Sequence, residues 1–243
     1  MSRTKVYFDG YELTSLCRVS NLREPLLTRR VDTIDVPGRD GSLLTGVSLG
    51  ERSQTVTISL MGRNIEERRA AGRTLAKILA VKDARPFALS IDRGLYHMAI
   101  PIADTDGLIA GNATQYDVTF RCLDPVAYGE ERTVTVPSGG SVSFLVGGSY
   151  PTMPMVSVAA AANAANGYWR LSLDDGEYLQ TKIPSGVSTA PVEFDCAGRV
   201  LKVSGDVKML YKLANWLVLE PGRHTLTMTG SGDAVVKFVE RWL

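Results

Sequence analysis

The chain has 243 residues, of which 44% are hydrophobic and 22% charged, and its formal net charge is +1. This length suits one large β-domain or two ordinary domains with real cores, and the composition is that of an ordered globular protein. No stretch approaches the roughly 18 to 20 apolar residues of a membrane helix, and a charge near zero gives no overall attraction to nucleic acid. Asp9 and Gly10 come before any signal-peptide core could form, so we expect the protein to stay in the cytoplasm that makes it unless something larger carries it out.

Residues that bind metals or perform catalysis are scarce. The three cysteines, Cys17, Cys122 and Cys196, show no paired spacing, which argues against a disulfide framework and against a zinc site. We expect them to be buried or half-buried free thiols. The two histidines, His97 and His224, each lie within a strand-like pattern. The sequence therefore predicts no metal site and no cofactor.

The first part of the chain predicts strands around one helix. Residues 52–61 alternate between apolar and polar, as in a half-buried strand. Asn64 is predicted to cap a helix over residues 65–79, with Glu67 completing a capping-box pattern. Further strands are expected at residues 87–91, 96–102 and 115–122.

The second part predicts a β-sandwich. Asp124-Pro125 interrupts the last strand of the first part, and we place a domain boundary after Glu130. Beyond it, short strands alternate with turns such as Asp175-Gly176, a spacing typical of sandwiches. The small-residue run 159–167 is expected to be a strand end followed by a loop. Strands are expected at residues 169–173, 192–196, 200–203, 216–219, 224–228 and 234–243.

The basic residues differ between the two parts. Up to Glu130 there are 14 arginines and 3 lysines, and after it there are 5 of each. Arginine makes bidentate, weakly hydrated contacts that suit protein interfaces. The first part could therefore carry an interface, although the codon usage of a GC-rich genome is an alternative explanation.

Several motifs of the first part, taken in order, resemble a known family. An opening Phe8-x-Gly10 hairpin is followed by residues 31–43, with the sequence VPGRDG at 36–41. Then come the strand and helix described above and a closing strand that ends at Asp124-Pro125. This series resembles the phage tail-component domain of siphophage distal tail proteins. The second part ends with Leu219-Glu220-Pro221-Gly222, followed by a terminal Arg241-Trp242, and is similar to the galectin-like C-terminal domain of the same family.

The resemblance implies a mainly β fold with two domains. Residues 1–130 would form a ring-forming β-sandwich or barrel-like domain with one α-helix, and residues 131–243 a galectin-like β-sandwich. The implied function is that of a structural virion protein and not of an enzyme. A ring of six subunits connects the tail tube to the tail tip, baseplate and hub. The implied partners are the major tail tube protein, the tail hub or tail-associated fibre protein, and receptor-binding proteins, with no membrane and no sequence-specific nucleic acid. The implied location is the tail tip of the virion, after assembly in the host cytoplasm.

The loop over residues 29–44 is rich in arginine, aspartate and glycine and could reach a neighbouring subunit. The alternative is a solvated β-hairpin in which Pro37-Gly38 and Asp40-Gly41 are ordinary turn residues. Given the resemblance, we favour the interface arm. The candidate interface residues are Arg29, Arg30, Gly38, Arg39, Asp40 and Gly41.

Other chemistry finds little support in the sequence. Asp104-Thr105-Asp106-Gly107 superficially resembles a calcium loop but lacks the downstream ligands of an EF-hand, and there is no nucleophile elbow. The rival hypothesis is a carbohydrate-binding module, in which the sandwich recognises a saccharide of the host cell surface. It requires exposed aromatic residues, but Trp169 alternates in phase with neighbouring leucines and is expected in the core. Trp242 could cover the sandwich core as a lid.

Overall fold

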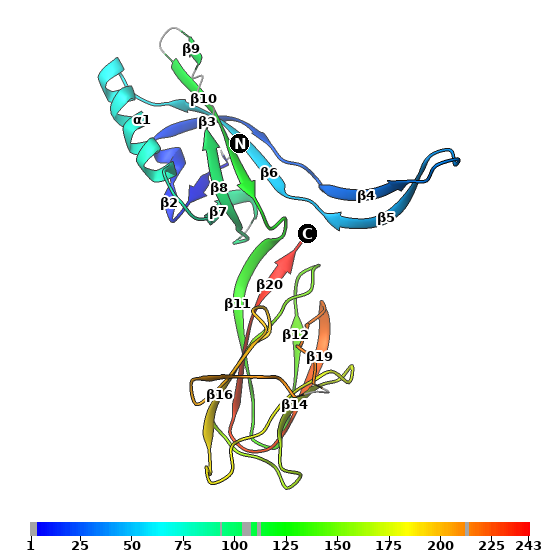
Figure 1. Ribbon diagram of the computed structural model, residues 1–243. Helices are drawn as coiled ribbons and strands as arrows, with labels where there is room; N and C mark the ends of the chain where they lie inside the picture. The colour runs from blue at the N-terminus through cyan, green and yellow to red at the C-terminus, as the bar shows by residue number, and fades with distance from the viewer. Residues whose placement is uncertain (1–3, 93, 104–107, 111–112, 212–213) are drawn as a thin grey trace. The chain divides into compact units, whose positions relative to one another are not determined.

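The computed structural model describes residues 4–92, 94–103, 108–110, 113–211 and 214–243. These residues are mostly strands, with one α-helix (Figure 1), so the predicted mainly β fold is confirmed. The chain divides into two compact units, one of residues up to Ala127 and one of Tyr128–Trp242. The division lies inside strand β11 (Ala127–Val136), whereas the sequence analysis placed the boundary after Glu130.

The first unit is built on one large sheet and one separate pair of strands. Its strands are β1 (Val6–Phe8), β2 (Tyr11–Glu12), β3 (Cys17–Arg23), β4 (Arg29–Asp35), β5 (Ser42–Leu49), β6 (Arg52–Leu60), β7 (Arg85–Leu89), β8 (His97–Ala103), β9 (Leu108–Ala110) and β10 (Ala113–Cys122). Two short 3-10 helices are η1 (Leu13–Ser15) and η2 (Ser90–Asp92). The eight-stranded sheet has the order β2-β1-β7-β8-β10-β6-β3, with β9 beside β10, and β4 pairs with β5 in a sheet of two.

The core of the first unit is centred on three aromatic rings. Phe87 and Phe120 stack with centroids 4.1 Å apart, Phe8 lies 5.4 Å from Phe120, and all three are buried. Phe8 is followed by a tight turn in which Asp9 and Gly10 have φ of 49° and 80°. Positive φ at two central residues is the geometry that suits a hairpin, and it turns β1 back into β2 as the opening motif predicted.

The helix α1 (Ile65–Leu79) has the predicted bounds and the predicted cap. Oδ1 of Asn64 accepts a hydrogen bond from the backbone N–H of Glu67 at 2.8 Å, and Oε2 of Glu67 accepts one from the N–H of Arg63 at 2.7 Å. These bonds satisfy donors that the first turn of a helix leaves without partners. Leu75 is the one residue of α1 that is buried, so the helix contacts the sheet over a narrow strip. No described helix combines the length and the apolar character needed to span a membrane.

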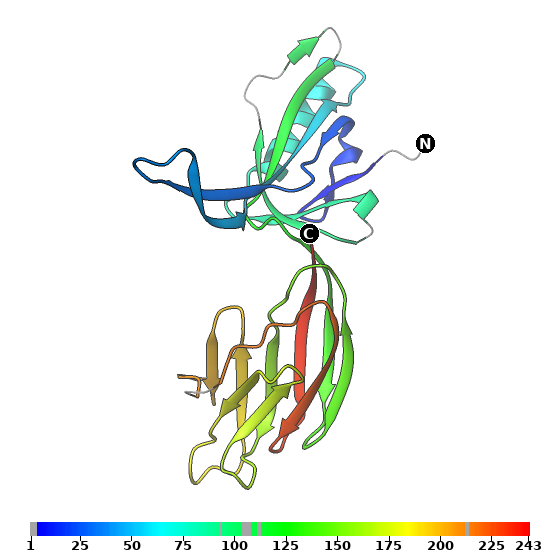
Figure 2. The same ribbon diagram turned by 90° about the vertical axis from the view of Figure 1, so that its right-hand side faces the viewer.

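The second unit is the predicted sandwich of two sheets (Figure 2). Beyond β11, its strands are β12 (Ser141–Val146), β13 (Met155–Ala161), β14 (Trp169–Leu173), β15 (Tyr178–Thr181), β16 (Ala190–Asp195), β17 (Val200–Val203), β18 (Asp206–Lys208), β19 (Gly222–Thr229) and β20 (Ala234–Trp242). One sheet has the order β11-β20-β13-β16-β17-β18 and the other β12-β19-β14-β15. Trp169 on one sheet stacks against Phe194 on the other, with centroids 5.8 Å apart, and both are fully buried. Trp169 is therefore a core residue, as expected.

One predicted strand of this unit is absent. Residues 216–219 form a loop in which only Leu219 makes an isolated bridge, to Thr152. Leu217 and Leu219 are fully buried, so their side chains fill the core from a loop rather than from a sheet. The strand predicted at residues 216–219 is therefore wrong.

Candidate inter-subunit interface

Strands β4 and β5 form a hairpin that we call the arm, residues 29–49. Within the described part of the chain, neither strand pairs with the eight-stranded sheet, and the hairpin extends away from the body of the first unit (Figure 1). Every residue of β4 is exposed. A lone two-stranded ribbon is only marginally stable in water, so contact with a partner is expected to stabilise the arm.

The tip of the arm is a tight turn set by its glycines. The backbone N–H of Arg39 donates a hydrogen bond to the carbonyl oxygen of Val36 at 3.1 Å. Gly38 and Gly41 have φ of 80° and 75°, a region in which other residues are strained. The turn residues predicted from the sequence thus form a well-defined tip. Such a turn is equally compatible with an interface arm and with a solvated hairpin.

The arm exposes aliphatic side chains on both of its faces. Val31 pairs across the strands with Val47, and Leu44 follows on the same face; their exposed fractions are 56%, 52% and 63%. On the other face Ile34 pairs with Leu43, and Ile34 is 54% exposed. Clusters of exposed aliphatic residues mark interaction surfaces. These side chains, which the sequence analysis did not single out, make the arm a candidate interface.

The candidate interface residues from the sequence lie at the two ends of the arm. Arg29 and Arg30 begin β4 and point to opposite faces, since successive side chains of a strand alternate. Residues 38–41 form the tip, about 20 Å away along seven residues of strand. Nε of Arg30 lies 3.3 Å from Oδ1 of Asp32, in an exposed pair that adds little stability. The six residues therefore do not form one cluster.

A partly buried polar cluster ties the base of the arm to the sheet. Oε1 of Glu24, which directly follows β3, accepts hydrogen bonds from Nε2 of Gln54 at 3.0 Å and from Arg52. Gln54 is fully buried, and the side chain of Arg52 is 16% exposed. Burial, and next the charge of Arg52, lower the pKa of His97, which keeps its ring neutral at physiological pH. Removal of the Glu24 carboxylate would deprive a mostly buried guanidinium of this partner, which is expected to destabilise the base of the arm.

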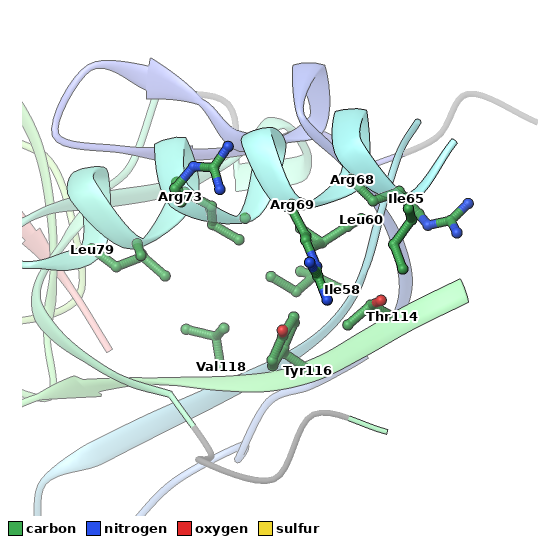
Figure 3. Close-up of a pocket in the computed structure, with 13 residues that line it drawn as sticks. Ile58, Leu60, Ile65, Arg68, Arg69, Arg73, Leu79, Thr114, Tyr116 and Val118 are labelled. Carbon is green, nitrogen blue, oxygen red and sulfur yellow. The ribbon is translucent and has the colours of Figure 1, made fainter. Parts of the chain in front are cut away.

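A second candidate surface lies between α1 and the sheet. This α1 groove has a volume of about 500 Å³ and an aliphatic floor that includes Ile58, Leu60 and Val118 (Figure 3). From the helix, Arg69 extends toward Tyr116 on β10 (Figure 3). Gly72 of α1 lies close to Leu60 of β6, because a Cβ added at residue 72 would lie only 3.1 Å from Cδ1 of Leu60. The absence of a side chain at residue 72 thus allows α1 to pack close to β6.

The second unit presents polar and aromatic side chains on the outer face of its smaller sheet. The guanidinium of Arg170 lies 4.0 Å from the ring centroid of Tyr178, and Nε of Arg170 donates to Oε1 of Gln180 at 2.8 Å. Tyr168 and Tyr211 form a further pair with centroids 5.0 Å apart. Trp242, expected as a lid, is partly buried in β20.

Among the described residues, no three side chains of His, Cys, Asp or Glu come together as a metal-binding group. Residues 104–107, the loop with some likeness to a calcium site, lie outside the described residues. The three cysteines are buried free thiols, as expected. Burial raises the pKa of Cys17 and of Cys122 to about 11 and that of Cys196 to about 12, so all three stay protonated and unreactive at neutral pH.

Two family models match most of the chain. Residues 9–122 match the phage tail protein RIFT-related domain, and residues 147–242 match the C-terminal domain of the siphovirus-type tail component. The chain belongs to the siphophage tail-component family. The resemblance drawn from the sequence is thereby confirmed, and this family member is a structural component of a siphovirus-type phage tail.

A solved phage protein shows the same fold, and two further structures are similar to a lesser degree. The Dit protein (gp 19.1) of phage SPP1, described as a paradigm of the hub adsorption apparatus in phages that infect Gram-positive bacteria, is 22% identical, with 100% of each chain covered and a TM-score of 0.81. The baseplate of phage P2 in its activated conformation with Ca gives 9% identity, 98% of each chain and a TM-score of 0.49. The baseplate of phage p2 in its activated conformation with Sr gives 10% identity, 97% of each chain covered and a TM-score of 0.48. No curated protein matches the chain. The likeness to the SPP1 protein extends over both domains of this family member.

Proposed function

We propose that the chain is a distal tail protein that forms a ring of six subunits. Residues 1–130 would build the ring, and the ring would join the tail tube to the tail tip, baseplate and hub. The observation that carries the proposal is the arm, an exposed hairpin with aliphatic residues on both faces that pairs with no other strand of the described chain. In a closed ring each subunit gives its arm to one neighbour and receives the arm of another, which covers all arms at once.

The two faces of such a ring would meet different proteins. One face would bind the major tail tube protein, and the other the tail hub or tail-associated fibre protein. The galectin-like sandwich of residues 131–243 would lie outside the ring and could dock receptor-binding proteins. The protein would act in the virion, at the tail tip, after assembly in the host cytoplasm.

Light scattering coupled to size exclusion, over a range of protein concentrations, tests the ring. We expect the mass of six chains, or a concentration-dependent rise toward it, and closed rings in negative-stain images. A protein that stays monomeric at every concentration, alone and with purified tail tube or hub protein, would contradict the proposal.

A saccharide-binding sandwich is the second candidate, and the outer face of the smaller sheet favours it. Tyr178 of β15 stacks with Arg170 of β14 and has Ser172 of β14 as its cross-strand partner, and sugars bind to such combinations of an aromatic face and polar groups. Trp169, however, is buried and cannot contribute a ring. Specific hits of the full chain on a glycan array, lost in Tyr178→Ala and kept in Tyr11→Ala at an exposed site of the first unit, would favour this function.

A further inference from the structure

The α1 groove combines an aliphatic floor with arginine side chains of α1. Arg69 and Arg73 line it from one side of α1, four residues apart and hence on one helix face. Of the carboxylates that the structure describes, none lies within ion-pair distance of either guanidinium. Ile65, which also lines the groove, is 57% exposed. The groove therefore suits an occupant with aliphatic side chains and carboxylates.

The outer half of the arm has this chemistry. Between residues 32 and 44 there are three aspartates and one arginine, a net charge of −2. Asp35 and Asp40 flank the turn, while Ile34 and Val36 are 54% and 39% exposed beside them. The groove and the arm tip are thus complementary in charge, and each has apolar surface to cover.

The arm of one subunit cannot reach its own groove, because the two lie at opposite ends of β6. The arm leads into Arg52, at the start of this strand, while the groove is lined by Ile58 and Leu60 at its far end. A strand of nine residues separates these ends by about 25 Å, and the arm extends away from α1 (Figure 1). Contact between the two surfaces must therefore join two molecules. Since the surfaces differ, the contact is heterologous and can repeat around a ring.

We infer that the α1 groove receives the arm tip of a neighbouring copy of this chain. Aliphatic side chains near the tip, Ile34 and Val36, enter the groove, and Asp35 and Asp40 face the arginines of α1. A volume of about 500 Å³ takes a few side chains and not the whole hairpin, so the tip docks by its edge. The inference rests on the proposed ring and adds to it the surface that receives the arm.

Charge reversal tests the pairing in the full-length protein. The groove variant Arg69→Glu with Arg73→Glu has an acidic arm and an acidic groove, while the arm variant Asp35→Lys with Asp40→Lys has a basic arm and a basic groove. In either variant alone, the arm and the groove carry charges of the same sign and repel each other. We therefore expect sedimentation velocity to show self-association at least roughly tenfold weaker than in the wild type. An equimolar mixture of the two restores association, because arms and grooves of opposite charge then alternate around an even-numbered ring. The combination of all four substitutions in one chain restores it as well.

The matched control is Lys77→Glu with Lys82→Glu, which changes the net charge as the groove variant does at positions that do not line the groove. Circular dichroism checks that every variant is folded. If the wild type assembles and both reversed variants assemble equally well, the ring stands and the groove is not the receiver. If the variants fail and the mixture also fails, the arm does not occupy the groove, and a segment of another tail protein becomes the candidate. If neither the wild type nor the mixture associates at any concentration, alone or with purified tail tube or hub protein, both this inference and the proposed ring are wrong.

Discussion

Replacement of Val31, Leu44 and Val47 with serine is expected to abolish most self-association of the protein. Each of these side chains is more than half exposed in the single subunit. Full burial of a Val or Leu side chain is worth about 1.5–3 kcal/mol, so covering the exposed half yields roughly 1 kcal/mol per residue. The three together would contribute roughly 3 kcal/mol to each contact between subunits, and their loss would weaken that contact on the order of 100-fold.

The same substitutions should leave the isolated subunit folded. The three side chains do not belong to the core of the first unit, and polar residues are tolerated on an exposed ribbon. The assay is light scattering over a concentration series, with thermal unfolding of the same samples measured in parallel. The matched control replaces Leu145, Met155 and Val207, which are exposed to a similar extent in the second unit, with serine. An arm variant that assembles at the wild-type concentration would refute the role of the arm, and one that unfolds would show that these residues stabilise the subunit itself.

Three further predictions concern the arm arginines and the two local structures that the sequence located best. Replacement of Arg29, Arg30 and Arg39 with alanine should weaken ring formation in size exclusion while circular dichroism stays unchanged; wild-type assembly would show that the arm does not use them. Asn64→Ala should lower the free energy of unfolding by about 1 kcal/mol in urea titration, because the hydrogen bond to the Glu67 N–H is lost, and an unchanged value would mean that water replaces the cap without loss. Trp169→Ala should destabilise the second unit by about 3–5 kcal/mol, with loss of its near-UV signal, because it leaves a large cavity against Phe194; a smaller effect would mean that the sandwich collapses around the gap.

The parts of the fold that could be predicted are those fixed by neighbouring residues. The cap of α1 depends on Asn64 and Glu67, three positions apart, and the helix appears with the predicted bounds. The burial of Trp169 follows from its alternation with Leu171 and Leu173 in one strand, and all three are buried. Local spacing was sufficient in both cases because the partners that decide the outcome lie in the same element.

The parts that could not be predicted depend on contacts between distant segments. Glu24 and Gln54 come from two separate segments, and nothing in their local sequence indicates that they meet at the base of the arm. Residues 216–219 are all apolar, as in a buried strand, but among the described residues only Leu219 makes a bridge to another segment. A sequence pattern can report that a side chain is buried without reporting which backbone, if any, pairs beside it.

The arm shows a different limit of sequence reasoning, and it is the one that matters for function. Val31 and Ile34 in β4 have the composition of an ordinary strand, and the sequence analysis therefore gave weight to the arginines and the turn instead. The structure shows that this strand has no core to cover, since every residue of β4 is exposed. A strand that has the residues of a buried element but remains open in the single subunit is best explained if its burial takes place in the assembly. The aliphatic residues of the arm, more than its charges, are therefore expected to supply the free energy that would stabilise the proposed ring.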